Sequence, residues 1–506
     1  MRQLLFALIF STTTLFSQSK LDSLVLKVNE QFFQFNFSDA DKTFEDIIKL
    51  YPESSQGYYI KSRNCLWFYL ANKDSLSKNL FSKFYKIALQ KAEKEYNLDK
   101  TNAKLTFNLG NIYYLNSIYN SSEQNSMDAF WSTKNAVGYF EDAIELNENF
   151  FEPYLPLGTI QYALSFVPGF LGWAISIVGL EGDKTEGLNN INLAFENCNN
   201  CTVEAAYHLG KIYTEYNAQY IKAEKLLSNI VNEYPKNELF LYQYAILKID
   251  KKELQEALAI LDRIIFGIKK PNFLQTYALS FFLKGEILFK LNRFNDAIIE
   301  YDKFIQKTLS NDYTGIANLK IALAFEMLNK KHLAQKHYIL ARNGNQNIAE
   351  DISASELSKI YFDKIFSNND KLIVRAKNYL ESGNYIEVNN ILSDLNKKIM
   401  TDELTFSAKL ILVETLQNLN KFDKSSEILK SYYDNSEINS YKEVPKFYYL
   451  NALQKFHNKQ YSNSKENLDL AFSSKNDSDN KLNRLLVNLS QKLDKIINNS
   501  QNRDNN

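Results

Sequence analysis

Two cysteines three positions apart, Cys198 and Cys201, are the most reactive pair in this chain of 506 residues. A zinc site would need a second cysteine pair, and covalent haem attachment would need a histidine where Thr202 stands. In an oxidising compartment the pair could instead close a small disulfide that stiffens a turn between helices. A catalytic redox role would need a βαβ pattern, which the surrounding sequence lacks. The sequence leaves open whether the pair is a structural disulfide or two free thiols.

The four histidines do not suggest a metal or catalytic site. His332 and His337 are five residues apart and therefore do not share a helix face. None of the four has cysteine or carboxylate neighbours at metal-ligand spacing. The sequence also contains no glycine-rich phosphate loop and no nucleophile-elbow motif. We therefore expect a protein that has no catalytic residues, metal or cofactor and that binds other molecules.

The composition indicates a long helical protein that does not bind nucleic acid. Glycine and proline number only 15 and 7, while aromatic residues make up 14% of the chain, which suits helices better than a loop-rich β fold. Lys and Arg together number 59, as do Asp and Glu. Proteins that bind nucleic acid usually carry a basic excess, so this balance argues against a nucleic-acid partner.

The elements that would position these residues repeat along the chain. One type of segment has Leu-Gly followed three positions later by an aromatic residue, and the next has alanine followed by a large residue. Small residues let two helices cross closely, and large residues fill the space beside the crossing. The pattern predicts an all-α fold, an α-solenoid in which helical hairpins stack into a right-handed superhelix. Clear examples are Leu109-Gly110, Leu157-Gly158 and Leu209-Gly210 for first helices, and Ala136, Ala297 and Ala334 for second helices.

These segments resemble tetratricopeptide repeats from about residue 21 to residue 472. The resemblance implies an array that holds segments of partner proteins. The expected organisation is a signal peptide at 1–17, N-terminal hairpins at 18–100, a central array at 101–345, degenerate hairpins at 346–472 and a polar, partly disordered tail at 473–506 with one short helix at Leu482–Ile497.

Two insertions interrupt the central array. Residues 120–132 begin polar and predict a surface loop. Residues 165–182 are nearly all apolar but too short, and too often broken by proline and glycine, to span a bilayer. They could form an extra helix that plugs the array, or an apolar patch that contacts lipid or a partner through Phe166, Phe170 and Trp173.

Part of this second insertion is similar to the tetratricopeptide-repeat-39 family. The similar segments are Ser165 to Pro168, Val178 to Leu180 and Gly182 to Leu188, although Gly169 stands where that family has a second proline. The resemblance implies a similar architecture and an association with apolar ligands. Family members are intracellular, some are associated with organelle surfaces or lipid stores, and they have no established enzymatic activity.

The first helix of each hairpin should line the inner surface of the array, where a partner would bind. The residue three before the small signature residue should point into that groove, and at this position the units are rich in aromatic residues. Such side chains offer a large contact area at low entropic cost and could hold a peptide or helix. The alternative is that they pack against neighbouring helices as core. With nearby positions, the predicted groove comprises Phe107, Asn111, Tyr114, Tyr207, Lys211, Tyr242, Phe282 and Phe289.

The first residues predict export. Met1-Arg2 precedes the apolar run Leu4–Phe10, and a small residue, Ser17, stands at the expected cleavage point, although a buried first helix is the alternative. We therefore expect a protein-interaction scaffold of the bacterial cell envelope, periplasmic or associated with the outer membrane. The alternative function is a peripheral binder or carrier of lipid that uses residues 165–180.

Overall fold

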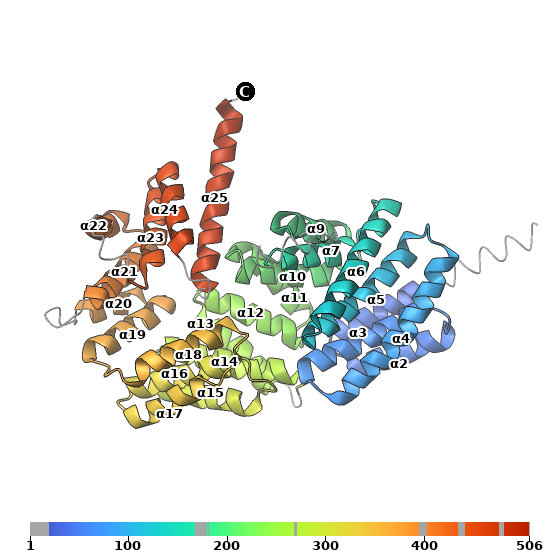
Figure 1. Cartoon of the computed structure of the whole chain (residues 1–506), viewed down its shortest axis with the longest axis horizontal. Coiled ribbons are helices and arrows are strands. Elements are labelled where there is room, and N and C mark those ends of the chain that lie inside the picture. The colour runs from blue at the N-terminus through green and yellow to red at the C-terminus, as the bar shows by residue number, and fades with distance from the viewer. Residues whose placement is uncertain are drawn as a thin grey trace, which may run out of the picture. The chain divides into compact units, whose positions relative to one another are not determined.

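The computed structural model describes residues 20–166, 180, 182–267, 271–393, 402–433, 441–474 and 480–504, and every regular element within these ranges is helical. Successive helices pair as antiparallel hairpins, which confirms the prediction of an all-α solenoid (Figure 1). The predicted signal peptide at 1–17 lies outside the described residues. None of the helices in these ranges combines the length and apolar character that a bilayer crossing needs.

The chain divides into two compact units. Unit 1 comprises Met1–Gly210, Glu224–Leu241 and Asn272–Leu274, and unit 2 comprises Lys211–Ala223, Tyr242–Pro271 and Gln275–Asn506. Three helices contribute substantially to both units: α10 (Thr202–Glu215), α11 (Tyr220–Glu233) and α12 (Glu238–Asp250). Of α14, which is given below with unit 2, only Leu274 belongs to unit 1. The other helices of unit 1 are residues 20–33, α2 (Phe37–Leu50), α3 (Ser55–Asn72), α4 (Ser75–Leu98), α5 (Ala103–Ser122), α6 (Ser126–Leu146), α7 (Tyr154–Leu164) and α9 (Lys184–Asn197).

Unit 2 continues the same hairpin pattern toward the C-terminus. Its further helices are α13 (Leu254–Phe266), α14 (Leu274–Lys290), α15 (Phe294–Lys307), α16 (Thr314–Met327), α17 (Lys331–Ala341), α18 (Ala349–Phe362), α19 (Asn368–Glu381), α20 (Tyr385–Ser393), α21 (Asp402–Asn418), α22 (Phe422–Tyr433), α23 (Val444–His457), α24 (Tyr461–Ser474) and α25 (Asn480–Asp504).

The turns inside the hairpins share one backbone design. The amide of Arg293 donates to the carbonyl of Leu288 at 2.9 Å, and Asn292 before it has a φ of 59°. This is the Schellman arrangement, in which a left-handed residue satisfies the last carbonyls of a helix. The turn between α21 and α22 has the same form, because Asn420 has a φ of 56°. Corresponding left-handed residues are Gln124, Ala218, Lys252, Asn329, Gly383 and Lys459.

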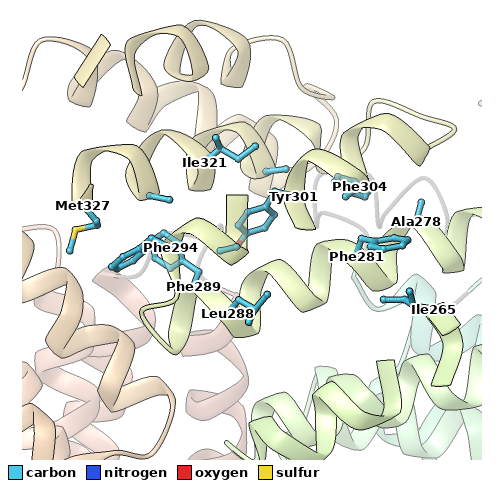
Figure 2. Close-up of a cluster of buried hydrophobic side chains, with 13 residues drawn as sticks. Ile265, Ala278, Phe281, Leu288, Phe289, Phe294, Tyr301, Phe304, Ile321 and Met327 are labelled. Atoms are coloured by element: carbon cyan, nitrogen blue, oxygen red, sulfur yellow. The ribbon is translucent and has the colours of Figure 1, made fainter. Parts of the chain in front are cut away.

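The small signature residues lie where helices cross closely. An ideal β-carbon built on Gly285 of α14 would lie only 2.8 Å from the ring of Tyr301 on α15. Tyr301 is fully buried, and together with Phe281, Phe304 and Ile321 it belongs to the core that joins α13, α14, α15 and α16 (Figure 2). The missing side chain at Gly285 thus makes room for the large ring, as the spacing predicts.

Two segments are more helical than predicted. The expected loop at 120–132 is wrong, because α5 continues to Ser122 and α6 already begins at Ser126, leaving only a short turn. Phe130 packs against the core around Phe140, which gives the start of α6 an apolar face to bury. The tail also contains a helix, as predicted at Leu482–Ile497, and this helix is the longer α25, from Asn480 to Asp504.

Helix α25 is held by two adjacent stripes. Its apolar stripe is buried against Ala452 of α23 and Leu468 and Ala471 of α24. Its polar stripe contacts earlier parts of unit 2: Arg484 pairs with Asp250 at 2.5 Å, and the amide of Asn488 donates to the carbonyl of Asn217 at 2.9 Å. The apolar stripe consists of Leu482, Leu486, Leu489 and Leu493, and the polar stripe of Lys481, Arg484, Asn488 and Gln491.

Candidate functional site

The predicted groove residues of unit 1 are largely packed between helices. The ring of Phe107 lies 5.8 Å from that of Phe140 and 5.4 Å from that of Phe150, and Tyr207 lies 5.5 Å from Phe240. The hydroxyl of Tyr114 is 3.2 Å from that of Thr159. Asn111 is buried. These contacts match the alternative in which the aromatic stripe is part of the core.

The predicted groove residues of unit 2 behave in the same way. Phe282 is half-buried, and its ring lies 5.2 Å from that of Phe304. Phe289 is only 4% exposed and belongs to the core, so its placement in a groove is wrong. Lys211 and Tyr242 are half-buried. The aromatic position, three before the signature residue, therefore does not identify an open binding surface.

The apolar insertion is described only at its edges. Phe166 is 46% exposed, and the amino group of Lys184 lies 4.3 Å from the centre of its ring. Leu180 is buried in the cluster around Phe140 and Leu157. Phe170 and Trp173 lie outside the described residues. The exposed ring of Phe166 beside Lys184 supports the interpretation that this segment contacts lipid.

Cys198 and Cys201 are joined by a disulfide, with their Cα atoms 5.7 Å apart. The bond links the end of α9 to the residue that precedes α10, so it closes the turn between two hairpins. Cys65 is a buried free thiol, and burial raises its pKa to about 11, which makes it unreactive at neutral pH.

A cavity of about 460 Å³ opens in unit 1, and most of the charged groups that line it form ion pairs with one another. The amino group of Lys104 lies 2.5 Å from the carboxylate of Asp22, and that of Lys94 lies 3.3 Å from Glu53. Among the described residues, no cluster of three or more histidine, cysteine or acidic side chains could hold a metal ion.

A surface that the sequence analysis did not single out lies in unit 2, on the first helices of the hairpins and at their ends. We call it the charged surface. Its ion pairs connect helices that are distant in sequence: Lys290 of α14 and Lys481 of α25 lie 3.3 and 3.5 Å from Glu381 of α19. The charged surface consists of Asp250, Lys252, Glu286, Lys290, Lys320, Lys377, Glu381, Glu414, Glu443, Lys446, Lys481 and Arg484.

Further ion pairs on the same surface link other hairpins. Lys446 on α23 lies 2.7 Å from Glu414 on α21. Lys377 on α19 lies 2.7 Å from Glu443, which precedes α23. These side chains are half-buried rather than sealed in a core, so each pair remains within reach of solvent and of a ligand.

The charges on this surface influence one another strongly. Burial opposes the charge of Glu381, but Lys481, Lys290 and Lys320 together hold its pKa well below its usual value. Burial alone would likewise lower the pKa of Lys446, yet Glu414 raises it above the ordinary lysine value. Glu381 and Lys446 therefore both stay ionised around neutral pH.

The sequence carries a signal for this surface at two positions that follow the small residue of a first helix. Charged residues stand one and five positions after the small signature residue: Glu286 and Lys290 follow Gly285, and Lys377 and Glu381 follow Ala376. One turn of helix separates the two positions, so both side chains lie on the same face.

The chain matches a known sequence family over its central part. Residues 81–311, somewhat less than half of the chain, match the family described as Iml2/Tetratricopeptide repeat protein 39. No curated protein matches the sequence. The family match covers the insertion at 165–182 and supports the tetratricopeptide character of the repeats.

Several solved structures of repeat proteins are similar to the chain at low identity. A tetratricopeptide repeat protein from Parabacteroides merdae is 13% identical, with 57% of this chain and 99% of that chain covered and a TM-score of 0.25. Yeast Tom70 is 14% identical, with 90% and 96% covered and a TM-score of 0.32. The human IFIT1 dimer with PPP-AAAA is 14% identical, with 74% and 93% covered and a TM-score of 0.38.

Proposed function

We propose that this tetratricopeptide-type repeat protein is a non-catalytic scaffold that binds segments of partner proteins on the charged surface of unit 2. The observation that carries the proposal is the concentration of half-buried charges of both signs on the first helices of successive hairpins. Such a surface can distinguish partners, because a segment with the wrong charge pattern would place like charges opposite one another.

The arrangement suits recognition better than stabilisation of the fold. Exposed ion pairs contribute little to stability, typically about 0 to 1 kcal/mol each. Lys377 and Lys481 are 43% and 47% exposed, so their pairs with Glu443 and Glu381 can be exchanged for pairs with a ligand. A partner segment that carries both signs of charge would replace these contacts one for one.

The proposed place of action is the cell envelope, periplasmic or associated with the outer membrane of a bacterium. The basis for this proposal is the predicted signal at 1–17. The disulfide between Cys198 and Cys201 suits an oxidising compartment of this kind.

The second candidate function is contact with lipid at the edge of unit 1. Phe166 is exposed at the start of the apolar insertion, and Met127 and Trp131 are exposed on α6, whose start packs against the same apolar cluster through Phe130. Lys134 lies 5.4 Å from the ring of Trp131. Aromatic residues flanked by lysines are typical of membrane-surface contacts.

Affinity capture from crosslinked envelope extract tests the scaffold function. The tagged chain is compared with the double variant Lys377→Ala/Lys481→Ala, which changes the two most exposed lysines that form ion pairs on the charged surface. The matched control is Lys303→Ala/Lys465→Ala, since these lysines are similarly exposed and pair with carboxylates, but lie on second helices. A protein lost with the first pair and kept with the second supports the proposal.

Other outcomes count against the charged surface. If both variants capture the same proteins as the unchanged chain, partners do not bind there. If no protein is captured and the chain floats with anionic vesicles, the lipid function replaces the scaffold. Loss of flotation on Phe166→Ser would then assign the contact to the apolar insertion.

A further inference from the structure

We infer that Lys252 anchors a binding site for an acidic side chain of a partner protein within the charged surface of unit 2. The inference rests on the proposed function, because it names the chemistry of the partner that this surface receives. Lys252 lies in the turn between α12 and α13, next to Asp250 at the end of α12.

The amino group of Lys252 forms a hydrogen bond to a hydroxyl rather than to a carboxylate. It donates to the hydroxyl of Tyr385 at 3.1 Å and lies 5.1 Å from the centre of that ring. Among the described residues, no acidic group lies within ion-pair distance of it. A lysine amino group has three donors, so two of them are available to a ligand.

The neighbouring carboxylates are already committed to other lysines. Glu414 pairs with Lys446 at 2.7 Å, and Glu381 is shared by Lys290 and Lys481. The amino group of Lys252 nevertheless lies within electrostatic reach of the two glutamates and of Lys446 and Lys481. Lys252 is therefore half-buried and has no counter-ion of its own among the described residues.

The burial of Lys252 and the charges around it favour the binding of an anion there. Burial disfavours the charged amino group, the positive charges of Lys481 and Lys446 add to this effect, and its pKa is lowered despite the nearby glutamates. A carboxylate placed beside Lys252 would compensate the cost of burying the amino group and offset the repulsion from Lys481 and Lys446, since it supplies a counter-ion. Counting the whole charged surface, seven side chains are basic (Lys252, Lys290, Lys320, Lys377, Lys446, Lys481 and Arg484) and five are acidic (Asp250, Glu286, Glu381, Glu414 and Glu443).

A single acidic side chain fits this surface better than the backbone of a nucleic acid. Glu381 and Glu414 lie among the lysines and would repel an unbroken row of phosphates. A peptide can place one carboxylate at Lys252 and present basic or neutral residues to the glutamates. The favoured ligand is therefore a protein segment with isolated acidic residues.

The backbone at this turn allows a clean test. Lys252 has a φ of 66°, and Asn292, Asn329 and Asn420 hold the corresponding position in other turns of unit 2. Asparagine tolerates a left-handed backbone better than lysine does, so Lys252→Asn removes the amino group and preserves the turn. Lys459 provides the matched control, because it stands exposed in the equivalent turn between α23 and α24 with a φ of 60°.

The assay is a fluorescence anisotropy titration with a labelled peptide of alternating glutamate and glycine. Its C-terminus is amidated, so that only side-chain carboxylates can bind. We expect Lys252→Asn to weaken binding by about tenfold, as loss of one charge-assisted hydrogen bond implies. Lys459→Asn should bind like the unchanged chain, Lys252→Arg should keep most of the affinity, and a glutamine version of the peptide should not bind.

Other results would overturn the site. Equal affinity of the unchanged chain and Lys252→Asn would do so, as would an oligonucleotide of equal charge that binds more tightly than the peptide. Thermal unfolding of both asparagine variants establishes that they fold. If capture identifies a partner whose binding does not depend on Lys252, the scaffold function stands and the site is wrong. If the peptide result holds and no partner is captured, the site stands and the scaffold function is wrong.

Discussion

The close crossing of α7 and α9 in unit 1 yields a sharp prediction about stability. Gly158 of α7 faces Gly187 of α9, and a β-carbon at Gly158 would lie 2.6 Å from the carbonyl oxygen of Gly187. It would also lie 2.9 Å from the backbone nitrogen of Ile191. Both obstacles are backbone atoms, which cannot rotate away as a side chain can. Gly158→Ala therefore requires α7 and α9 to move apart.

The size of the effect follows from two opposing contributions. Overpacking of a well-packed contact costs about 1 to 3 kcal/mol, and a clash with backbone belongs at the upper end. Alanine gains about 1 kcal/mol over glycine inside a helix. We expect Gly158→Ala to lower the free energy of unfolding by about 2 kcal/mol. Gly138 of α6 is the matched control, because nothing lies within 4 Å of its β-carbon position, so Gly138→Ala should stabilise by about 1 kcal/mol.

Urea denaturation followed by circular dichroism measures the two variants side by side. The same substitution should shift the midpoint in opposite directions, with a difference of about 3 kcal/mol between the variants. Hydrogen exchange should accelerate in α7 and α9 for Gly158→Ala only. If Gly158→Ala were as stable as Gly138→Ala, the close crossing of these helices would be wrong.

Three further predictions concern unit 2 and the disulfide. Arg484→Asp should release α25 and speed hydrogen exchange at its amides, while adding Asp250→Arg should restore protection; failure of the double variant to recover would mean that the pair is incidental. The pKa of Glu381 is lowered in the folded chain. The ionised carboxylate therefore stabilises the fold at pH values above its ordinary pKa of 4.5, and this stabilisation is lost as the pH falls below 4.5. The urea midpoint should therefore drop between pH 6 and pH 3, and less steeply in Glu381→Gln. Alkylation of the native chain should modify neither Cys198 nor Cys201 until reductant is added, as the mass would show.

The sequence predicted the hairpins because close packing imposes a strict spacing on them. The pairing of Gly285 with Tyr301 depends on two residue sizes at a fixed separation, and such a pattern is visible without coordinates. The polar residues at 120–132 were misleading, because they cover a helical extension whose apolar side is carried mainly by Phe130. Polarity of composition alone did not distinguish an exposed helix from a loop.

The charged surface escaped prediction for a different reason. Its members are one or two charges on each of seven helices and at the helix ends, and each looks like an ordinary solvated residue along the chain. Only the fold brings Lys290 within 3.3 Å of Glu381, ninety-one positions later, and leaves Lys252 without a carboxylate. In the tail, the sequence predicted the helix only at Leu482–Ile497, because the four buried leucines of α25 lie within this range and the ends of the helix are rich in asparagine.

The contacts of α25 also set the order in which unit 2 can be completed during synthesis. Asn488 binds the carbonyl of Asn217 across a separation of 271 residues, and Arg484 binds Asp250 across 234. A chain emerging from the ribosome exposes the turn at Asn217 long before the helix that covers it has been made. Unit 2 thus cannot finish folding repeat by repeat, as a simple linear array would. Its last step joins the two ends of the unit, so a nascent chain that stalls before α25 leaves those early residues uncovered.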